Sequence, residues 1–457
     1  MMTYEKAVET INSLLVFGSK PGLERVRELV DRIGSPDKQL KFIHVAGTNG
    51  KGSVCAYLSE ILHQAGYKTG MFISPFVIEF RERFQINGEM IPKERLASIT
   101  EEVYPVVEAM KAEGKIITEF EMVLAVGLKW FAEEKCDIVV LETGLGGRFD
   151  ATNIISVPLV SVIMSISLDH TAILGDTAPK IAFEKCGIIK AGGTTVLYGE
   201  QPEGVLEVVQ SAVNERHNHL LIADPSTVTE LSSGLDGSDF LFHDPKLFDG
   251  QTLTLHTPLI GQHQLKNAAA ALNVCAALRE KEVSISLDAI ANGISHTTFP
   301  ARLELLSKEP VILLDGAHNP GGAASLRDAI QKHLQGYHKI AVVGMLADKD
   351  VHTALSLLIP LFDKVIAVSP DNPRAMSETD LAKIVESFGV SAETETDYQK
   401  AYSRAVQYAS QTPNGAVIMF GSLYLASTLR RQAAAPDLGN QRCHTPILPA
   451  QSLRSRL

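Results

Sequence analysis

Several features that mark secreted, disulfide-rich or membrane proteins are scarce in this sequence. It has five cysteines among 457 residues, an odd number with no C-x-x-C pair, so neither a disulfide framework nor a thiolate zinc site is indicated. No run of about 18 apolar residues is present to span a bilayer. The first residues, MMTYEKAVETINSLLVF, include acidic side chains and lack the apolar core of a signal peptide. We therefore expect a cytoplasmic protein with no membrane partner.

Positive charge is also in short supply. The 42 Lys and Arg residues against 53 Asp and Glu residues give a formal net charge of −11, which argues against a protein that coats nucleic acid or anionic lipid. An anionic substrate would need a locally basic pocket. Hydrophobic residues make up 45% and charged residues 21%, as in ordinary globular proteins. The length exceeds what one hydrophobic core usually holds, so we expect two domains.

From about residue 40, short apolar runs alternate with turns and with segments of helical periodicity. This alternation predicts parallel strands joined by helices. The expected strands of the first part are Lys41–Ala46, Gly70–Ile73, Asp137–Leu141, Leu159–Ile166 and Thr194–Tyr198. Residues 201–258 contain short alternating runs with Ser and Gly and predict a small β-rich insertion, and Gln264–Leu278 is Ala-rich and helical.

A polar stretch at Asn292–Pro300 predicts the boundary to a second part. The alternation starts again after it, with expected strands at Val311–Leu314, Lys339–Val343, Lys364–Val368 and Ala416–Phe420. We predict an α/β fold in two domains. A P-loop-containing domain with a mostly parallel sheet covers residues 1–296, and a smaller Rossmann-like α/β domain covers 297–431. Residues 432–457 have no usable periodicity and are expected to be a mobile tail.

The clearest functional signal is the segment KFIHVAGTNGKGSVCAYLSEIL. An apolar strand leads into a Gly-rich turn and then a helix, the turn being Gly47, Thr48, Asn49, Gly50, Lys51, Gly52 and Ser53. Such a turn points backbone N–H groups and a helix N-terminus at one place, with a lysine as the charge for phosphate oxygens. The standard G-x-x-x-x-G-K-[ST] pattern is not met, because Gly52 stands at the Ser/Thr position. A Mg²⁺ ion on the nucleotide must therefore find another ligand, unless this is an ordinary Gly-rich turn.

Polar side chains follow three of the expected strands. Ser74 comes after strand 70–73, Glu142 after 137–141 and His170 after 159–166. Open α/β sheets collect their binding sites at these strand ends. A carboxylate, a hydroxyl and an imidazole near the phosphate loop would form a magnesium site. The plainer alternatives are a turn residue before proline, a solvated strand end and a structural histidine.

Two helical segments carry ambiguous signals. Lys185 lies near the end of a helix that Pro179 would begin, and by itself is interpreted as a solvated lysine. Thr118 and Glu121 fit the S/T-x-x-E capping box, so a structural role there is as plausible as a binding role.

Two further segments lie at turns. The glycines at 144, 146 and 147 lack the G-x-G-x-x-G spacing of a dinucleotide site. In the second part, Asp315 and His318 follow strand 311–314 and are candidates for a site.

Taken together, these segments resemble the folylpolyglutamate synthase and dihydrofolate synthase branch of the ATP-dependent Mur ligase family. The resemblance runs from about residue 4 to 430. It is carried by KPGLERV at 20–26, GTNGKGS at 47–53, SPFVIEFRERFQING at 74–88, TEFE at 118–121, ETGLGGRFDATN at 142–153, LDHTAILG at 168–175, IAFEKCGIIK at 181–190, GQHQLKNAAAA at 261–271, FPARLE at 299–304 and LDGAHNP at 314–320. The ordered set is specific, whereas no single segment is.

The resemblance implies an enzyme that joins glutamate to a carboxylate of a folate or of dihydropteroate, with ATP as co-substrate and two Mg²⁺ ions. It implies magnesium ligands at Ser74, Glu142 and His170, and a carbamylated lysine at Lys185. Catalytic roles would belong to Lys51, His170, Lys185 and His318. ATP would contact residues 47–53, Asn267, Arg302 and Asp315, and the pterin would contact Gly22, Leu23, Arg25, Thr118, Phe120 and Glu121. A monomer is expected.

Two departures and three alternatives accompany this interpretation. Phe76 stands where many relatives have His, and Cys186 replaces a common alanine beside Lys185. Extension of folate polyglutamate is favoured, with dihydrofolate synthesis left open as a second activity. A cell-wall Mur ligase is the first alternative outside this branch, but it should lack the pterin-side segments. A P-loop regulator without ligase activity is the second, and it would not need the segments of the second domain.

Overall fold

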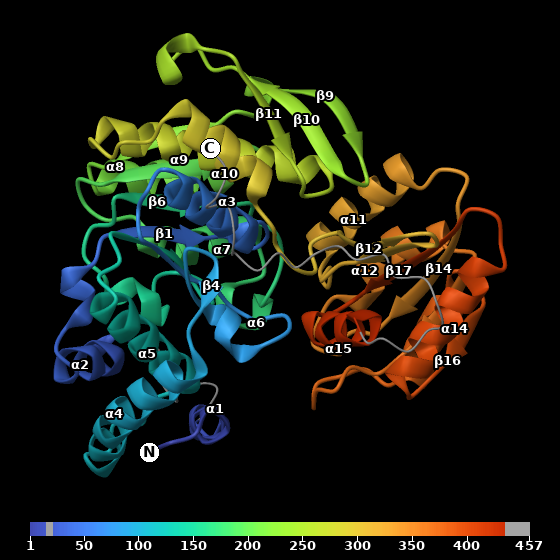
Figure 1. The fold of residues 1–457 in the computed structure, drawn as a ribbon, viewed down its shortest axis with the longest axis horizontal. Helices are drawn as coiled ribbons and strands as arrows, with labels where there is room; N and C mark the ends of the chain where they lie inside the picture. The colour runs from blue at the N-terminus through green and yellow to red at the C-terminus, as the bar shows by residue number, and fades with distance from the viewer. Residues whose placement is uncertain (15–21, 435–457) are drawn as a thin grey trace, which may run out of the picture.

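The structure is a computed structural model that describes residues 1–14 and 22–434. Within these residues the strands form three sheets. In Figure 1 the second large sheet and its helices form a lobe beside the first, and the small third sheet lies over the first lobe. In the same residues, no helix is both long and apolar enough to cross a membrane.

The first sheet is mostly parallel, as predicted. Its strand order is β4-β3-β2-β5-β1-β6-β7-β8, with antiparallel pairing only where β3 meets β2 and β4. The strands are β1 (Phe42–Ala46), β2 (Thr69–Phe72), β3 (Phe84–Ile86), β4 (Glu89–Met90), β5 (Ile138–Glu142), β6 (Val160–Ile163), β7 (Thr194–Tyr198) and β8 (His219–Ala223). The short edge hairpin β3–β4 was not predicted, because its few residues carry no apolar run.

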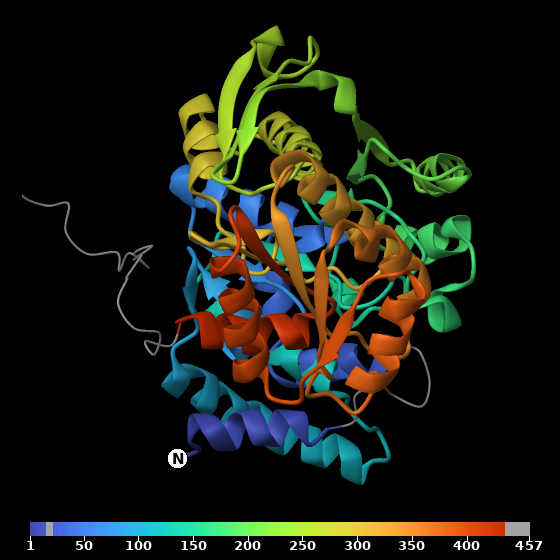
Figure 2. The same ribbon diagram turned by 90° about the vertical axis from the view of Figure 1, so that its right-hand side faces the viewer.

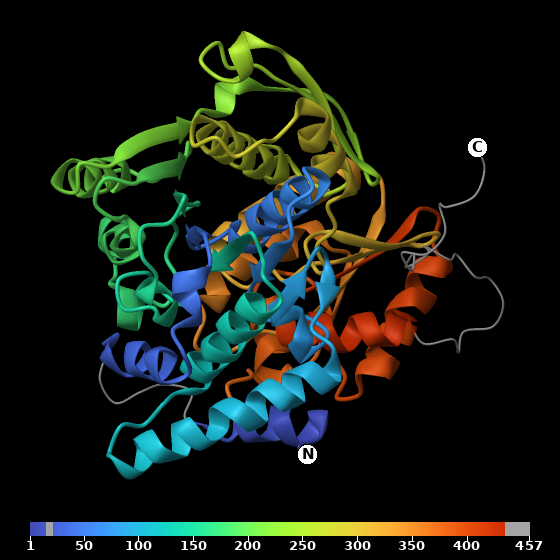
Figure 3. The same cartoon turned by 60° about the vertical axis from the view of Figure 1, so that its left-hand side comes forward.

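Helices cover both faces of this sheet, as its apolar strands require. The alternation in β1 shows why, since Ile43 and Val45 pack on one face while Phe42 packs on the other. The first face carries α3 (Lys51–Gln64), α9 (Gln262–Glu280) and α10 (Leu287–His296). The other carries α1 (Tyr4–Asn12), α2 (Glu24–Arg32), α4 (Lys93–Ala112) and α5 (Glu119–Glu133), with α1 lying along α4 in Figure 3. Helices α6 (Thr171–Leu174), α7 (Ala178–Lys185) and α8 (Val205–Glu215) follow β6 and β7.

The second large sheet is parallel except for its edge strand β12 (Glu304–Lys308). Its order is β12-β13-β17-β14-β15-β16, and Figure 2 views this lobe from its outer side. The remaining strands are β13 (Val311–Leu314), β14 (His338–Val343), β15 (Lys364–Ala367), β16 (Ala392–Thr394) and β17 (Gly415–Phe420). Helices α11 (Pro320–His333), α12 (Val351–Leu358) and α13 (Glu378–Ser387) pack on one face, and α14 (Tyr398–Ser410) and α15 (Leu423–Ala434) on the other.

Three expectations about segments need correction. The expected β-rich insertion at 201–258 contains helix α8 and strand β8, which extends the first sheet, so only β9 (Val228–Gly234), β10 (Gly237–Phe242) and β11 (Leu253–Thr257) form the small antiparallel sheet. The polar stretch that begins at Asn292 is helical to His296, because its apolar residues, such as Ile294, pack against the first sheet's core. Residues 432–434, which we expected to belong to a mobile tail, continue helix α15 to Ala434. Residues 435–457 lie outside the described part of the chain.

Candidate active site

A cleft lies between the two large sheets, where the carboxyl ends of their parallel strands face each other. The cleft gathers the nucleotide and metal candidates from both parts of the sequence. Its lining includes Gly47, Thr48, Asn49, Gly50, Lys51, Gly52, Ser53, Ser74, Glu142, His170, Asn267, Arg302, Asp315 and His318. Segments that are some 270 residues apart in the sequence therefore meet at one place, as the hydrogen bond of 3.2 Å from Asn319 Nδ2 to Asn49 Oδ1 shows directly.

The Gly-rich turn after β1 is shaped by close approaches of its neighbours. Gly50 has φ of +83°, and a Cβ there would lie 2.7 Å from Asn267 Oδ1, so glycine fits where other residues would be strained. Helix α3 begins at the next residue, Lys51, and its N-terminal N–H groups face the cleft. Thr48 Oγ1 donates to Ser167 O and accepts from Ser167 N, each at 3.1 Å. These contacts fix the loop in a conformation in which an anion can bind at the N-terminus of α3.

The packing around Gly52 explains why the Ser or Thr of the standard P-loop motif is absent here. A Cβ at this position would lie 2.5 Å from the ring of Phe299, which belongs to the segment linking α10 to the second sheet. The guanidinium of Arg302 lies 5.3 Å from the centroid of the same ring. The ring therefore occupies the space that a Ser or Thr side chain would need, and it joins the nucleotide loop to the linker.

Glu142 ends β5 and is buried, with 4% of its surface exposed. Its Oε2 accepts a hydrogen bond of 3.1 Å from the backbone N–H of Ser74, and its Oε1 lies 3.7 Å from Lys51 Nζ. Burial raises the pKa of Glu142, and the charge of Lys51 only partly opposes this. A buried carboxylate with one weak cationic partner is a favourable position for a metal ion.

The donor set was tested against the chemistry of Mg²⁺. The cleft lining offers the Glu142 carboxylate, the Ser74 hydroxyl and the imidazole of His170, whose side chain is 38% exposed. Within residues 1–14 and 22–434, no three His, Cys, Asp or Glu side chains form a preformed metal cluster. Mg²⁺ is normally held by one or two protein oxygen ligands together with water and substrate phosphates. The oxygen groups present fit an ion that arrives with ATP rather than one in a closed cage.

Lys185 lies directly behind the nucleotide loop. It ends α7, is 4% exposed, and its Nζ donates a hydrogen bond of 2.7 Å to Gly47 O. Burial, with a contribution from the nearby charge of Lys51, lowers the pKa of Lys185 to about 7. The interpretation as a solvated lysine is therefore wrong, because a helix of mixed composition gave no indication that its last residue turns inward. A large share of this amine is neutral near pH 7, as addition to CO₂ requires.

An ion pair that the sequence did not indicate joins the two halves of the cleft. Lys349 Nζ lies 2.7 Å from Asp169 Oδ1 and 3.4 Å from His170 Nε2. Asn319 Nδ2 donates to Asp169 Oδ2 at 3.2 Å, and His318 Nε2 lies 3.8 Å from that oxygen. Burial acts against ionisation of Asp169, but His318 and Lys349 hold its pKa well below the usual range. Lys349 lies in a polar turn that carries no motif. Only its contact with Asp169 in the folded chain identifies it as part of the site.

Asp315 and Arg302 form the wall contributed by the second sheet. The Asp315 carboxylate accepts hydrogen bonds of 2.7 Å from the N–H groups of Leu303 and Ala317. Burial raises the pKa of Asp315, and the charge of Arg302 opposes the rise. Ala301 and Leu303, on either side of Arg302, have φ of 52° and 49°. These left-handed conformations are costly for residues with a side chain, and they set the direction of the arginine between them.

The pterin-side candidates lie outside the lining of the cleft, in or just before α2 and α5. The predicted capping box is confirmed, since Thr118 Oγ1 accepts from Glu121 N and the Glu121 carboxylate accepts from Thr118 N. Glu121 also pairs with Arg25 at 3.2 Å. Phe120 connects this region to the cleft, because a Cβ on Gly144 would lie 2.6 Å from its ring. Gly22 and Leu23 precede α2, directly after residues outside the described part of the chain.

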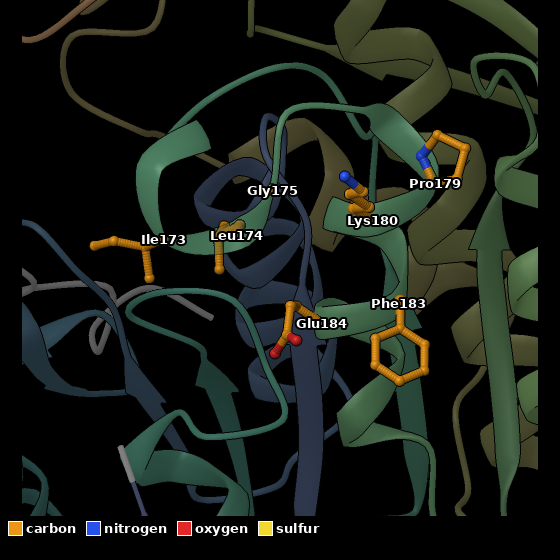
Figure 4. Close-up of a pocket in the computed structure, with 7 residues that line it drawn as sticks. All are labelled: Ile173, Leu174, Gly175, Pro179, Lys180, Phe183 and Glu184. Carbon is orange, nitrogen blue, oxygen red and sulfur yellow. The ribbon is translucent and has the colours of Figure 1, made fainter. Parts of the chain in front are cut away.

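A second, more open hollow lies between α6 and α7 (Figure 4) and shares Leu174 with the lining of the cleft. Its two charged side chains are already paired. Lys180 Nζ donates to Asp176 at 2.8 Å, and Glu184 accepts from Arg148 at 2.7 Å. This hollow therefore lacks the under-compensated charges of the cleft, and the cleft is the better candidate for the active site.

Comparisons with known proteins point in one direction. Residues 45–275 match the Mur ligase middle domain, and residues 301–423 match the Mur ligase glutamate ligase domain. The chain is 35% identical to a dihydrofolate synthase/folylpolyglutamate synthase of Bacillus subtilis, over 94% of this chain and 99% of that protein. It is 32% identical to a folylpolyglutamate synthase of Lacticaseibacillus casei, over 94% and 98%. A structure of Mycobacterium tuberculosis folylpolyglutamate synthase complexed with ADP superposes with a TM-score of 0.86 at 29% identity, covering 94% and 98%.

Proposed function

The chain belongs to the Mur ligase family, in its folylpolyglutamate and dihydrofolate synthase branch, and from this premise we propose how its cleft works. It is an ATP-dependent ligase that adds L-glutamate to folates. The observation that carries the proposal is the meeting of the nucleotide loop, Glu142 and the Asp315 wall in one cleft, with Lys185 hydrogen-bonded to the back of that loop. The cell-wall ligase and the P-loop regulator are not supported by the relatives found.

The reaction has two steps. A carboxylate oxygen of the folate attacks the γ-phosphorus of ATP, the bond to the bridging oxygen breaks, and ADP leaves an acyl phosphate behind. The α-amine of glutamate then attacks the acyl carbon, the tetrahedral intermediate collapses, and inorganic phosphate leaves as the amide forms with loss of a proton from the amine. Little covalent chemistry is required of the protein, so it contributes mainly position and charge.

The protein groups divide between the two ends of ATP. The N–H groups of residues 47–53 and the ammonium of Lys51 bind the phosphates and offset the charge of the transferring phosphoryl group. Asn267, Arg302 and Asp315 hold the rest of the nucleotide, and His318 faces the reacting end. Ser74, Glu142 and His170 would hold Mg²⁺, which supplies charge neutralisation and in-line alignment of the phosphates when bound. Two ions are proposed.

Lys185 is proposed to act as its carbamate. Its amine is buried, depressed in pKa, and positioned against Gly47. Addition of its neutral amine to CO₂, with loss of a proton, converts a cation into an anion. That anion would help to hold the second metal ion. The neighbouring Cys186 is also buried, and burial raises the pKa of its thiol to about 12, so it stays a neutral neighbour that does not compete for CO₂.

The preferred acceptor and the domain division are proposals as well. We favour extension of folate polyglutamate, with dihydropteroate as a second acceptor, because the relatives include both single-activity and two-activity names. The pterin would lie against Gly22, Leu23, Arg25, Thr118, Phe120 and Glu121.

Domains at 1–296 and 297–431 accord with the matched ranges 45–275 and 301–423. A cytoplasmic location and a monomeric chain remain predictions from the sequence.

The deciding experiment measures phosphate release from Mg-ATP. The purified chain is given L-glutamate with a tetrahydrofolate, with dihydropteroate, or with a UDP-muramyl peptide. We expect glutamate-dependent release with the tetrahydrofolate and a slower release with dihydropteroate, and product analysis should show one added glutamate per phosphate. Release with neither pterin acid, or release only with the muramyl peptide, would contradict the proposal.

A further inference from the structure

Arg83 is a buried arginine whose side chain makes no hydrogen bond to any residue that the structure describes. It ends the short 3₁₀ helix η2 (Phe80–Arg83) and is 9% exposed. Its Nε is buried with no partner, and its Nη2 lies 3.6 Å from Glu119 Oε1, an ion pair too long for a hydrogen bond. A guanidinium carries five N–H donors, and buried donors are almost always satisfied. Among the described residues, Arg83 is therefore a cation prepared for an acceptor that the protein does not itself supply.

Arg81, two residues earlier on the same turn, shows what a structural arginine looks like here. Its Nε and Nη2 donate to the two Glu79 carboxylate oxygens at 2.6 and 2.9 Å, and its Nη1 donates to Ile91 O at 2.9 Å. The guanidinium of Arg81 is therefore engaged in hydrogen bonds that stabilise the turn. Arg81 and Arg83 therefore differ in function although they share one turn and one residue type.

The place of Arg83 lies between the two substrate regions. Its carbonyl oxygen accepts from Ile73 N at 3.2 Å, so Arg83 is adjacent to Ser74 on the phosphate side. Glu119, its ion-pair partner, lies next to Phe120 on the pterin side. The rings of Phe76 and Phe80 lie 5.3 and 5.4 Å from the guanidinium. Aromatic walls around a planar cation exclude water and strengthen its attraction for an anion.

We propose that Arg83 binds a carboxylate of the folate acceptor and thereby places the acceptor's reacting end beside Ser74 and Glu142. The inference rests on the proposed function. Two cations near the cleft are already engaged, since Lys349 is paired with Asp169 and Lys51 faces the nucleotide loop and Glu142. A bidentate arginine–carboxylate contact is strong and directional. It also offsets the repulsion between an anionic acceptor and the anionic phosphates.

The test compares Arg83→Gln and Arg83→Lys with Arg81→Gln as the matched control. Steady-state kinetics give KM for tetrahydrofolate, KM for ATP and kcat, and thermal melting gives stability. We expect Arg83→Gln to raise the acceptor KM by at least about 10-fold, which corresponds to about 1.4 kcal/mol, while the KM for ATP changes less than about twofold. Arg83→Lys keeps the positive charge but lacks the bidentate guanidinium, so its acceptor KM should rise less than that of Arg83→Gln. Arg81→Gln should lower the melting temperature and leave the acceptor KM unchanged.

Dihydropteroate, which has a single carboxylate, separates the two ways in which the contact can be made. An equal rise in KM for both acceptors assigns the contact to the carboxylate that is activated, and a rise confined to tetrahydrofolate assigns it to the α-carboxylate of its glutamate. An unchanged acceptor KM in a stably folded Arg83→Gln protein overturns the inference. So does a joint rise of both KM values with a loss of stability like that of Arg81→Gln. If the wild-type chain shows no turnover, the proposed function fails, and equilibrium binding of tetrahydrofolate to the same variants still decides the role of Arg83.

Discussion

Two clusters of charge in this molecule contain the same kinds of residue and behave in opposite ways. On the outer surface, Arg32 Nη2 lies 2.6 Å from both Glu28 and Glu113, and Lys115 Nζ lies 2.8 Å from Glu28. Each charge there has more than one partner. In the cleft, Glu142 is 3.7 Å from Lys51, and Lys185 donates only to a backbone oxygen.

The pKa values of the two clusters show what this difference does. Hydrogen bonds from Arg32 and Lys115 lower the pKa of Glu113 to about 2, whereas burial raises the pKa of Glu142. The surface charges are neutralised by each other and by water. Glu142 and Lys185 are kept from full compensation, unlike Asp169 in the same region, which pairs with Lys349, and we propose that a metal ion and CO₂ complete them. Incomplete pairing, rather than charge itself, distinguishes these two groups.

The largest effect is expected for Lys185→Ala. Loss of the buried amine removes the proposed carbamate, and we expect kcat to fall by roughly 100-fold or more, as when a charge-stabilising group is removed from an active site. Bicarbonate or a short carboxylate such as acetate should restore part of the activity. The matched control is Lys180→Ala on the same helix, where the lysine is exposed and paired with Asp176, and it should remain fully active. Equal activity of the two variants would return Lys185 to a structural role.

The same lysine gives a pH dependence with a defined sign. Its pKa of about 7 in the folded chain lies below the usual value of about 10.4. Between these values the unfolded chain binds more protons, so this residue makes the free energy of unfolding rise with pH from about 7 to about 10.4. Lys185→Ala should flatten the pH dependence of the melting temperature in that window. In the wild-type enzyme, added bicarbonate should stimulate turnover more at pH 6 than at pH 8, because less neutral amine is present at pH 6.

An intermediate effect is expected for Glu142→Gln, which keeps the shape and removes the charge. The Mg²⁺ concentration for half-maximal phosphate release should rise by about 10-fold, the usual order of effect for weakening a metal ligand environment. The melting temperature should change little, because removal of a buried anion that is poorly paired also removes its desolvation cost. An unchanged magnesium titration would contradict the assignment of Glu142 as a ligand.

The smallest effect is expected at the surface. Glu113→Gln breaks an ion pair that is open to water and to salt, so neither kcat/KM nor the magnesium titration should change, and the melting temperature should shift only slightly. Side-by-side assays of this variant and Glu142→Gln provide the measurement. A loss of activity at Glu113 comparable to that at Glu142 would remove the distinction between the two clusters.

The strands that build the cleft were predictable because parallel strands are apolar on both faces. Thr194–Tyr198 and Val311–Leu314 have the predicted bounds, and the other main strands are displaced by only a few residues. The capping box at Thr118 was equally visible, since it depends on neighbours in sequence. The mixed edge strands β3, β4, β12 and β16 were missed because short, partly polar strands have no run of apolar residues to mark them.

The site was predictable only where its residues follow strands. Glu142 and Asp315 could be anticipated because parallel strands share one carboxyl edge. Lys185 was anticipated only through the family resemblance and Lys349 not at all, because the position of each depends on burial and on a partner more than 100 residues away. Arg83 could not be told from Arg81 in the sequence, since only the fold shows which of the two has its donors occupied.

The contact of Gly52 with Phe299 limits how this loop can be redesigned. Insertion of the hydroxyl residue of a standard P-loop at position 52 would place a Cβ 2.5 Å from the ring, and the ring belongs to the linker that leads into the second sheet. The added side chain would collide with the Phe299 ring, so the linker would have to move before the new hydroxyl could reach a metal ion. In this chain the nucleotide loop therefore also packs against the linker. Gly52 leaves room both for the ring of Phe299 and for the phosphates.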